Sequence, residues 1–336
     1  MKRPLDASVI VCTRNRAASL GRTLLSLAAQ RVPDGLTFEV VVVDNASSDN
    51  TREVVAARAR KAPVEIRYAR EPVPGLSRAR NRGIAEARSN ALLWTDDDCL
   101  PASDWVASAA RVLGHQRRQI VAGQVLLHDL DDLPLTIKTS EVPETLTSYS
   151  KLFGFLHGCN MAMGREVVTE VGVFDPAFGA GTPLSSAEDT DLVYRALQAG
   201  IPVIYEPAIV VSHNHGRRTA ADHDRMVAGY KRGMGALAAK HLLHSRDIGP
   251  TKSTYWALRK ALLLWVKRRA DFGHVATEAN LVGGFSRYLL GATLDAARGR
   301  VCGTRAVALV LSGASRTTAA VASPAGAAEA AAVERV

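Results

Sequence analysis

Short apolar runs alternate with segments of helical periodicity over the first hundred residues of the chain. The apolar runs are rich in β-branched residues, which is typical of buried strands, and the segments between them carry apolar residues at spacings of three and four. Strands are predicted at residues 8–12, 38–43, 64–68 and 91–95, and helices at 17–30, from near 49 to about 60, and at 77–87. This alternation predicts an α/β fold with a mostly parallel sheet flanked by helices.

The pattern is less regular in the second part of the chain. Strands are predicted at 119–127, 160–163, 202–205 and 208–212, helices from 165 to Gly172 and at 187–199, and a long loop at 128–157. From Thr219 the pattern is almost wholly helical, and after residue 315 it is Ala-rich without a period. We therefore expect an α/β domain at 1–215, a basic helical extension at 216–314 and a disordered tail at 315–336.

Charge is distributed unevenly between these parts. The 336 residues include 42 Lys and Arg against 33 Asp and Glu, a net charge of +9. Residues 216–336 hold 19 basic and 8 acidic groups (+11), which leaves 23 and 25 (−2) for residues 1–215. The basic extension could face an anionic membrane surface or an anionic substrate, or it could be a solvated helical surface.

Composition favours a cytoplasmic location. The four cysteines, Cys12, Cys99, Cys159 and Cys302, are not spaced as metal ligands or redox pairs, which fits a reducing compartment. The first apolar run is too short for a signal peptide, and no run approaches the roughly 18 apolar residues of a membrane span. We expect a cytoplasmic protein. Any membrane association would be peripheral, at the inner face of the plasma membrane.

Polar clusters follow three of the predicted strands. They are Thr13-Arg14-Asn15, Asp44-Asn45 and Asp96-Asp97-Asp98. Open parallel sheets bind ligands beyond the carboxyl ends of their strands, so these clusters mark the expected site. Asp96 and Asp98 point the same way from an extended segment, a spacing that suits Mg²⁺ or Mn²⁺ bound with substrate phosphates. The alternative is a solvated acidic loop.

Two familiar phosphate-binding patterns are absent from the sequence. The turn after the first strand, Thr13 to Arg16, has no Gly-x-Gly-x-x-Gly pattern, which argues against a nicotinamide-dependent oxidoreductase. No Walker A motif occurs, so the chain is not a P-loop NTPase.

Other residues near the expected site have both binding and structural interpretations. Asp44 could accept hydrogen bonds from a base or ribose, or form an Asx turn or helix cap. Arg78 and Arg82 share a helix face, where one could bind a phosphate or base, or both could be surface charge.

A second group of carboxylates begins the helix predicted at 187–199. Ser185 and Glu188 have capping-box spacing, which offers a structural role for Glu188. Asp189 lies on the stripe of Leu192 and Val193, so it should point toward the core or a cleft. A carboxylate at a helix N-terminus stays ionised and could act as a general base, or it could be a buried carboxylate held by backbone amides.

Two histidines and a glycine-containing segment complete the candidates. His213 and His215 follow the last predicted strand, and His213 is the favoured third metal ligand, with a structural role as the alternative. The segment Gly158-Cys159-Asn160 would allow a backbone and an amide to approach a sugar.

Taken in order, these segments resemble the inverting glycosyltransferases of family 2, which have the GT-A fold. The resemblance spans roughly residues 6–215. It rests on Ser8-Val-Ile-Val-Cys-Thr-Arg-Asn-Arg, Val41-Val-Val-Asp-Asn-Ala-Ser-Ser-Asp-Asn-Thr, Gly75-Leu-Ser-Arg-Ala-Arg-Asn, Thr95-Asp-Asp-Asp-Cys-Leu-Pro, Gly158-Cys-Asn and Glu188-Asp-Thr-Asp-Leu. The implied activity is hexosyltransferase-like transfer of a sugar from a UDP-, GDP- or dTDP-sugar donor to an acceptor hydroxyl.

The resemblance also implies roles for individual residues. Asp98 would be the main metal ligand with His213, and Asp96 would lie nearer the ribose while also contributing to the metal site. Asp189 would be the catalytic base and Glu188 its neighbour at the acceptor. The donor would contact the remaining candidates, which are Thr13, Asn15, Asp44, Arg78, Asp97 and Asn160.

Alternatives remain for the reaction and for the partners. The Gln-x-x-Arg-Trp motif of processive members does not occur, so a single addition is expected. The rival interpretations are a sugar-1-phosphate nucleotidyltransferase and a non-catalytic nucleotide-sugar-binding protein. The acceptor could be lipid-linked, a polysaccharide or a small metabolite. Nucleic acid is not expected, because no aromatic stacking pattern accompanies the basic residues.

Overall fold

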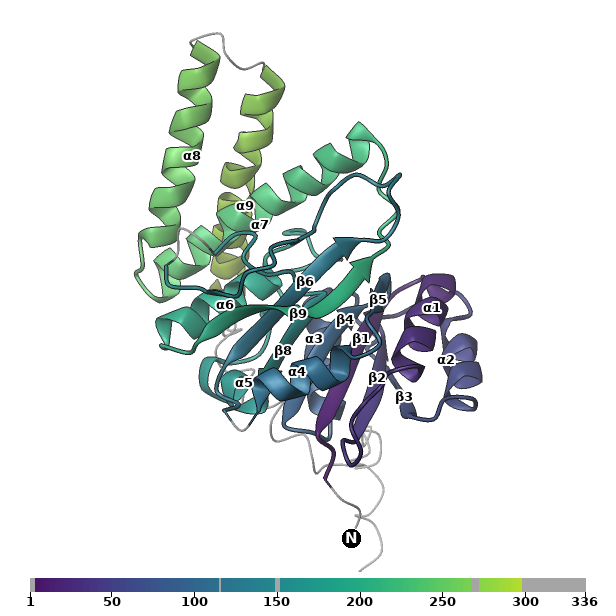
Figure 1. Ribbon diagram of the computed structural model, residues 1–336. Coiled ribbons are helices and arrows are strands. Elements are labelled where there is room, and N and C mark those ends of the chain that lie inside the picture. Colours follow the sequence, from purple (N-terminus) through teal and green to yellow (C-terminus); the bar gives the residue numbers. More distant parts are fainter. Residues whose placement is uncertain (1–3, 115, 149–151, 267–271, 298–336) are drawn as a thin grey trace, which may run out of the picture.

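The computed structural model describes residues 4–114, 116–148, 152–266 and 272–297 (Figure 1). Within these residues a nine-stranded sheet forms the centre of the molecule, with strand order β3-β2-β1-β4-β8-β6-β9-β5 and β7 paired to β9. Alternate side chains of its strands enter two hydrophobic clusters, one on each face. Ile10 belongs to one cluster, whereas Val9 and Val11 belong to the other. Helices cover both clusters, so the predicted α/β layering is confirmed.

The first half of the sheet is wholly parallel, as the alternating pattern predicted. Its elements are β1 (Ala7–Thr13), α1 (Ala17–Ala28), β2 (Phe38–Asp44), α2 (Thr51–Ala59), β3 (Glu65–Arg70), α3 (Leu76–Glu86) and β4 (Ala91–Asp96). Thr13 pairs with Asp44 across β1 and β2, and Cys12 pairs with Asp96 across β1 and β4. The register therefore aligns the polar strand ends at one edge of the sheet.

The second half makes the sheet as a whole mixed. It contains β5 (Cys99–Pro101), β6 (Ile120–Leu127), β7 (Glu144–Thr145), β8 (Asn160–Gly164) and β9 (Val203–His213). Strand β8 is antiparallel to β4 and β6, and β9 is parallel to β6 but antiparallel to β5 and β7. The expectation of a mostly parallel sheet thus describes the first four strands.

Several elements differ from the predictions. The two runs predicted at 202–205 and 208–212 form one strand, because a register shift between Gly123 and Gln124 accommodates the extra residues opposite β6. Strands β5 and β7 and helix α4 (Trp105–Leu113) were not predicted, and β7 lies inside the expected loop. Helices α5 (Arg165–Val171) and α6 (Glu188–Gln198) agree with the predictions at 165–172 and 187–199.

The C-terminal helices pack directly on the α/β core. They are α7 (Ala220–His244), α8 (Gly249–Val266) and α9 (Phe272–Ala297). Leu237 of α7 and Tyr288 of α9 lie in the same hydrophobic cluster as Trp94 of β4. Helices α7 and α9 cross closely: a Cβ added at Gly235 would lie 1.8 Å from the carbonyl oxygen of Leu281. The predicted helical extension is therefore continuous with the core as far as it is described.

Helix α8 and part of α9 project away from the sheet (Figure 1). In the described part of the chain, none of the helices combines the length and apolar character needed to span a bilayer. The tail expected at 315–336 lies outside the described residues.

Candidate active site

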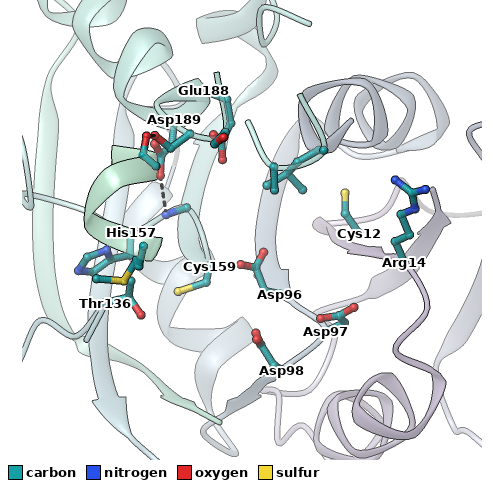
Figure 2. Close-up of a pocket in the computed structure, with 18 of the residues that line it drawn as sticks. Cys12, Arg14, Asp96, Asp97, Asp98, Thr136, His157, Cys159, Glu188 and Asp189 are labelled. Atoms are coloured by element: carbon teal, nitrogen blue, oxygen red, sulfur yellow. Dashed lines mark hydrogen bonds between the residues drawn. The ribbon is translucent and has the colours of Figure 1, made fainter. Parts of the chain in front are cut away.

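A pocket of about 780 Å³ opens at the carboxyl edge of the sheet. Its wall combines the ends of β1, β4 and β9, the start of α6, residues 157–159 before β8, and the first half of α7. Figure 2 shows that Cys12, Asp96, Asp98 and Asp189 face one shared space. The acidic triplet and the Glu188-Asp189 pair, which are about ninety residues apart in the chain, therefore line a single cavity.

Asp97 turns toward β1 and is held inside the protein. Its carboxylate accepts a hydrogen bond from Thr13 Oγ1 at 2.7 Å and another from Arg16 Nη1 at 3.0 Å. Burial raises the pKa of Asp97 to about 6 in spite of the Arg16 charge. Thr13 and Asp97 are thus bonded to each other at the floor of the pocket.

Asp98 lies between a cation and an imidazole. It accepts a hydrogen bond from Arg16 Nη1 at 2.6 Å, and its Oδ1 lies 3.4 Å from His213 Nε2. Burial acts to raise the pKa of Asp98, but His213 and Arg16 lower it below its usual range. Burial also acts to lower the pKa of His213, which the hydrogen bond and charge of Asp98 raise to about 9. Thr136 Oγ1, 3.1 Å from His213 Nδ1, orients the ring.

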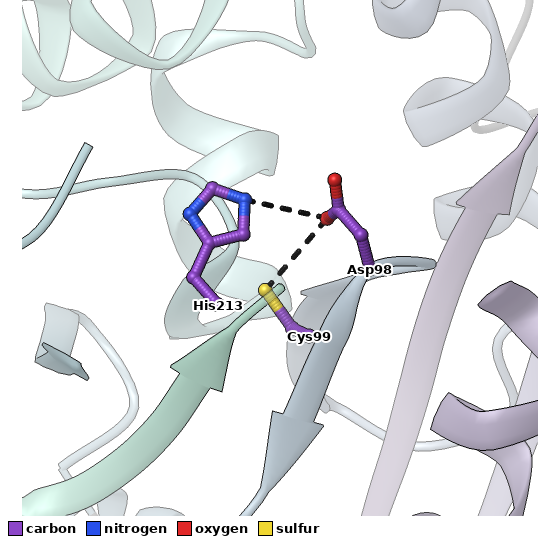
Figure 3. Close-up of side chains that lie close together, drawn as sticks. All are labelled: Asp98, Cys99 and His213. Atoms are coloured by element: carbon purple, nitrogen blue, oxygen red, sulfur yellow. Dashed lines mark hydrogen bonds and ion pairs between the residues drawn. The ribbon is translucent and has the colours of Figure 1, made fainter. Parts of the chain in front are cut away.

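Asp98, Cys99 and His213 could together hold a metal ion (Figure 3). One potential ligand atom of each lies within 4.8 Å of the others. A hydrogen bond with Cys159 and burial raise the pKa of the Cys99 thiol well above its usual value, so the carboxylate and imidazole are the stronger donors. Two of the three predicted metal ligands, Asp98 and His213, are therefore adjacent, whereas Asp96 faces Arg80 instead.

Arg80 joins the two acidic groups of the pocket. It is 2% exposed, and it donates from Nη1 to Glu188 Oε1 at 2.9 Å while its Nη2 lies 3.8 Å from Asp96 Oδ1. Burial and the charge of Asp189 raise the pKa of Glu188 to about 7, against the opposing charge of Arg80. The capping box proposed for Ser185 and Glu188 is not formed: α6 begins after Ala187, and no side-chain cap is found among the described residues.

Asp189 is half-buried at the first turn of α6 and lines the pocket. Its Oδ2 accepts a hydrogen bond from the Gly158 backbone N–H at 3.0 Å, and its Oδ1 accepts one from the Thr190 N–H at 2.7 Å. A Cβ at Gly158 would lie 2.6 Å from Arg80 Nη2, so only glycine allows this close approach.

Four predicted donor-binding residues lie outside the pocket wall, and three of them make structural contacts. Asp44 accepts from the Ser47 N–H, three residues on, at 2.8 Å and from Tyr68 Oη at 2.7 Å, so its carboxylate has a structural role. Asn15, in a left-handed conformation with φ 54°, accepts from the Ser48 N–H at 2.7 Å and joins two loops.

The other two are Asn160 and Arg78. Asn160 is 1% exposed, and its amide bonds to Trp105 Nε1 and to the carbonyl oxygens of Gln124 and Ile209. Arg78 is exposed on α3. Among the described residues, the pocket wall includes none of Asn15, Asp44, Arg78 and Asn160, and a role of these residues in donor binding stays a prediction.

Sequence reasoning missed several pocket residues. Arg80 lies on the buried stripe of α3 with Ser77 and Ile84, and an arginine on such a stripe is a signal for a buried ion pair. Arg16 directly follows the first polar cluster. His157, Arg217 and Tyr230 carry no comparable signal, because the fold alone brings them to the pocket.

Comparison with known proteins finds similarity to one family. Residues 8–172, a little under half of the chain, match the model of glycosyl transferase family 2. Over this segment the chain is similar to that family. The match covers β1 through α5, including the acidic triplet.

The chain is also similar to curated proteins, among them the following two. Succinoglycan biosynthesis protein ExoM of Rhizobium meliloti is 27% identical over 206 residues, which are 60% of this chain and 65% of that protein. A pre-mycofactocin glycosyltransferase of Mycobacterium tuberculosis is 26% identical over 256 residues, which are 70% of this chain and 48% of that protein. The chain thus spans between about half and two thirds of the length of these relatives.

The fold agrees with solved glycosyltransferases. The mannosyltransferase PcManGT from Pyrobaculum calidifontis, solved in complex with GDP-Man and Mn²⁺, superimposes with a TM-score of 0.57 at 20% identity, covering 86% of this chain and 88% of that one. The predicted GT-A type fold with a C-terminal helical part is confirmed.

Proposed function

We propose that this protein transfers a sugar from a nucleotide-diphosphate donor to an acceptor hydroxyl, in one addition and with inversion at the anomeric carbon. One observation carries the proposal: the Asp98–His213 pair and the Asp189 carboxylate open into the same pocket. A metal-binding group for the leaving diphosphate beside a carboxylate base is the arrangement that a direct displacement needs. Carboxylates on separate surfaces would have removed the active centre.

The donor would bind at the strand ends. Thr13 and Asn45 line this part of the pocket, with Asp96 at the end of β4. The structural likeness to a mannosyltransferase solved with GDP-Man and Mn²⁺ supports a nucleotide sugar, and UDP-, GDP- and dTDP-sugars all remain candidates. Asp97 would act through its bond to Thr13 rather than by direct contact.

Asp98 and His213 would hold a divalent ion, Mn²⁺ or Mg²⁺. A carboxylate and an imidazole suit such an ion, and Thr136 Oγ1, next to His213 Nδ1, would leave the Nε2 side of the ring for the ion. When bound, the ion would neutralise charge on the leaving diphosphate. Arg16, which contacts both Asp97 and Asp98, adds positive charge at the same place.

Asp189 would accept the proton of the acceptor hydroxyl as the oxygen attacks the anomeric carbon. The new C–O bond forms as the bond to the diphosphate breaks, so no covalent enzyme intermediate is required. The Gly158 N–H aims the carboxylate, and the Arg80–Glu188 pair fixes the first turn of α6 beneath it. Glu188 therefore supports Asp189 at the acceptor side.

Product analysis tests this proposal. We would incubate the protein with UDP-, GDP- and dTDP-sugars and Mn²⁺ and identify the nucleotide product. Release of a nucleoside diphosphate supports glycosyl transfer. Consumption of a nucleoside triphosphate and a sugar 1-phosphate with release of pyrophosphate would instead indicate the nucleotidyltransferase. Tight binding of a nucleotide sugar without turnover, in the presence of lipid-linked, polysaccharide and small acceptors, would indicate a binding protein.

A membrane-proximal acceptor is favoured by helix α8. Lys252, Trp256, Arg259 and Leu263 follow one another at spacings of four, three and four, and Trp256 and Leu263 are 57% and 41% exposed. An exposed stripe that mixes cationic and apolar side chains fits an anionic membrane surface. We therefore favour a lipid-linked acceptor at the cytoplasmic face of a membrane.

Vesicle flotation tests the membrane proposal. The protein should float with vesicles containing phosphatidylglycerol and remain unbound with pure phosphatidylcholine. Trp256→Ser combined with Arg259→Gln should weaken flotation. Equal recovery with both vesicle types would contradict an electrostatic surface.

A further inference from the structure

The loop that joins β9 to α7 places an arginine in the pocket wall. Arg217 is half-buried, lines the pocket, and follows His213 by four residues. Its Nη1 atom is shielded from solvent and has no hydrogen-bond partner among the described residues. A buried N–H of a guanidinium without a partner is costly, so this atom indicates an anion that the protein itself does not supply.

The backbone on both sides of Arg217 is firmly held. Buried Asp132 accepts from the Gly216 N–H at 2.8 Å and from Arg218 Nε at 2.9 Å. The backbone carbonyl oxygen of Arg217 accepts from the Leu133 N–H at 2.8 Å, and the backbone N–H of Arg217 donates to His215 Nδ1 at 3.0 Å. The loop therefore positions the side chain before any ligand binds, which lowers the entropic cost of binding.

Three other arginines of the pocket wall are already engaged. Arg16 contacts Asp97 and Asp98, and Arg80 contacts Glu188 and Asp96. Arg232 donates to Asn280 Oδ1 at 3.0 Å. Within the described residues no carboxylate is paired with Arg217, which is half-buried, whereas Arg14 of the same wall is exposed, so the charge of Arg217 is held in the pocket and available to a substrate.

We propose that Arg217 binds a phosphate group of a substrate in this pocket. The proposal rests on the proposed function, which brings phosphate into the pocket by two routes: the diphosphate of the donor, or a phosphate on a lipid-linked acceptor. A guanidinium matches phosphate oxygens through two parallel N–H donors, a geometry that a lysine cannot reproduce. Arg217 is thus a specificity-determining residue whichever substrate carries the group.

Direct binding measurements test the assignment without requiring turnover. Titration calorimetry would use UDP and GDP with Mn²⁺ as donor probes and farnesyl phosphate as the acceptor probe. The variants are Arg217→Gln and Arg217→Lys, with Arg60→Gln, an exposed residue of the same charge outside the pocket wall, as the matched control. Circular dichroism and thermal melting check that each variant folds.

Arg217→Gln should weaken at least one probe by about 10- to 100-fold, the usual effect of losing a charged hydrogen bond. A loss for UDP or GDP assigns the donor diphosphate, and a loss for farnesyl phosphate alone assigns the acceptor. Arg217→Lys should lie between wild type and Gln, which keeps the test decisive if the Gln variant unfolds.

Unchanged affinity for every probe in the Arg217 variants, or a wild-type protein that binds no probe, overturns the assignment. These outcomes are separate from the failure of the proposed function. If the protein binds nucleoside diphosphate through Arg217 but releases none from any nucleotide sugar, the phosphate site at Arg217 stands and the proposed transferase function fails.

Discussion

Arg80 and Glu188, 108 residues apart in the chain, form a buried ion pair with an Nη1–Oε1 distance of 2.9 Å. The pair links α3, which lies between β3 and β4 in the chain, to α6, which carries Asp189. Asp96 lies on the other side of the same guanidinium at 3.8 Å. The Arg80 guanidinium therefore compensates the negative charge of two carboxylates, Asp96 at the end of β4 and Glu188 at the start of α6.

Removal of this cation should destabilise the protein. Arg80→Gln leaves Glu188 and Asp96 without compensation, and we expect the free energy of unfolding to fall by about 3–5 kcal/mol. Urea denaturation measures the change. Arg118→Gln, which breaks the exposed Arg118–Glu170 pair, is the control and should change the free energy of unfolding far less. The double variant Arg80→Gln with Glu188→Gln should recover part of the lost free energy of unfolding. If Arg80→Gln and Arg118→Gln destabilised the protein equally, Arg80 would not be the buried compensating charge.

Asp189→Asn should abolish transfer while donor binding persists. The amide keeps the shape of the side chain but cannot accept the acceptor proton, so we expect a decrease in kcat of roughly 10²–10⁴-fold. Nucleoside diphosphate release measures kcat, and calorimetry with the donor measures binding. The matched control is Glu166→Gln, which neutralises an exposed carboxylate in the first turn of α5, outside the pocket wall. Transfer near the wild-type rate in Asp189→Asn would remove this residue as the base.

Asp98→Ala should weaken Mn²⁺ binding and, with it, metal-dependent donor binding. Asp98 supplies the carboxylate of the Asp98–Cys99–His213 group, whereas Asp97 bonds to Thr13 and Arg16. We expect at least a tenfold loss of Mn²⁺ affinity for Asp98→Ala and a smaller effect for Asp97→Asn. Electron paramagnetic resonance of free Mn²⁺ follows the titration. The reverse order of the two effects would assign the metal to Asp97.

Asp191 should make the protein sensitive to acid. Its fully buried carboxylate accepts from Arg195 Nε at 2.9 Å and lies 2.8 Å from Lys240 Nζ. Burial acts to raise the pKa of Asp191, but Arg195 and Lys240 hold it well below its usual value near 3.8. Because the folded-state pKa is depressed, this contribution is complete above about pH 4 and is lost as the pH falls through the folded value.

Asp191→Asn measures this contribution. At pH 7 the variant should be less stable by about 3–5 kcal/mol, because Arg195 and Lys240 lose a buried partner. Wild type and variant should converge as the pH falls below about 4. Chemical denaturation from pH 7 to pH 3 follows the difference, and a difference that stays constant over this range would contradict the depressed pKa.

The fold and the position of the site at one edge of the sheet could be predicted from sequence, because the patterns that indicate them involve residues close together in the chain. Each of the first four strands is a short apolar run, and parallel strands end at one edge, so Asp96 and Asp98 had to lie near Thr13. Asp189 could be placed in a cleft because its helical stripe is otherwise apolar. The unpredicted helix α4 contains Trp105 and Val106 among small residues and was not recognised as a periodic segment.

Residue roles were harder to predict because they depend on which partner the fold supplies. Asp44 follows its strand as Asp96 does, yet Tyr68 and the Ser47 N–H satisfy it. Asn160 is taken up by Trp105 and two carbonyl groups of the irregular β6–β9 region. Arg217 enters the pocket only because Asp132, distant in sequence, holds its loop.

The two halves of helix α7 contact different parts of the protein. Its first half presents Arg225, Met226 and Tyr230 to the pocket, and its second half is clamped through Lys240 and His241 to the helix that carries Asp189. Substitutions in the first half can therefore change the lining of the cavity without loosening the helix that carries Asp189. Changes to what the cavity admits and changes to the stability of α6 thus fall on different turns of one helix.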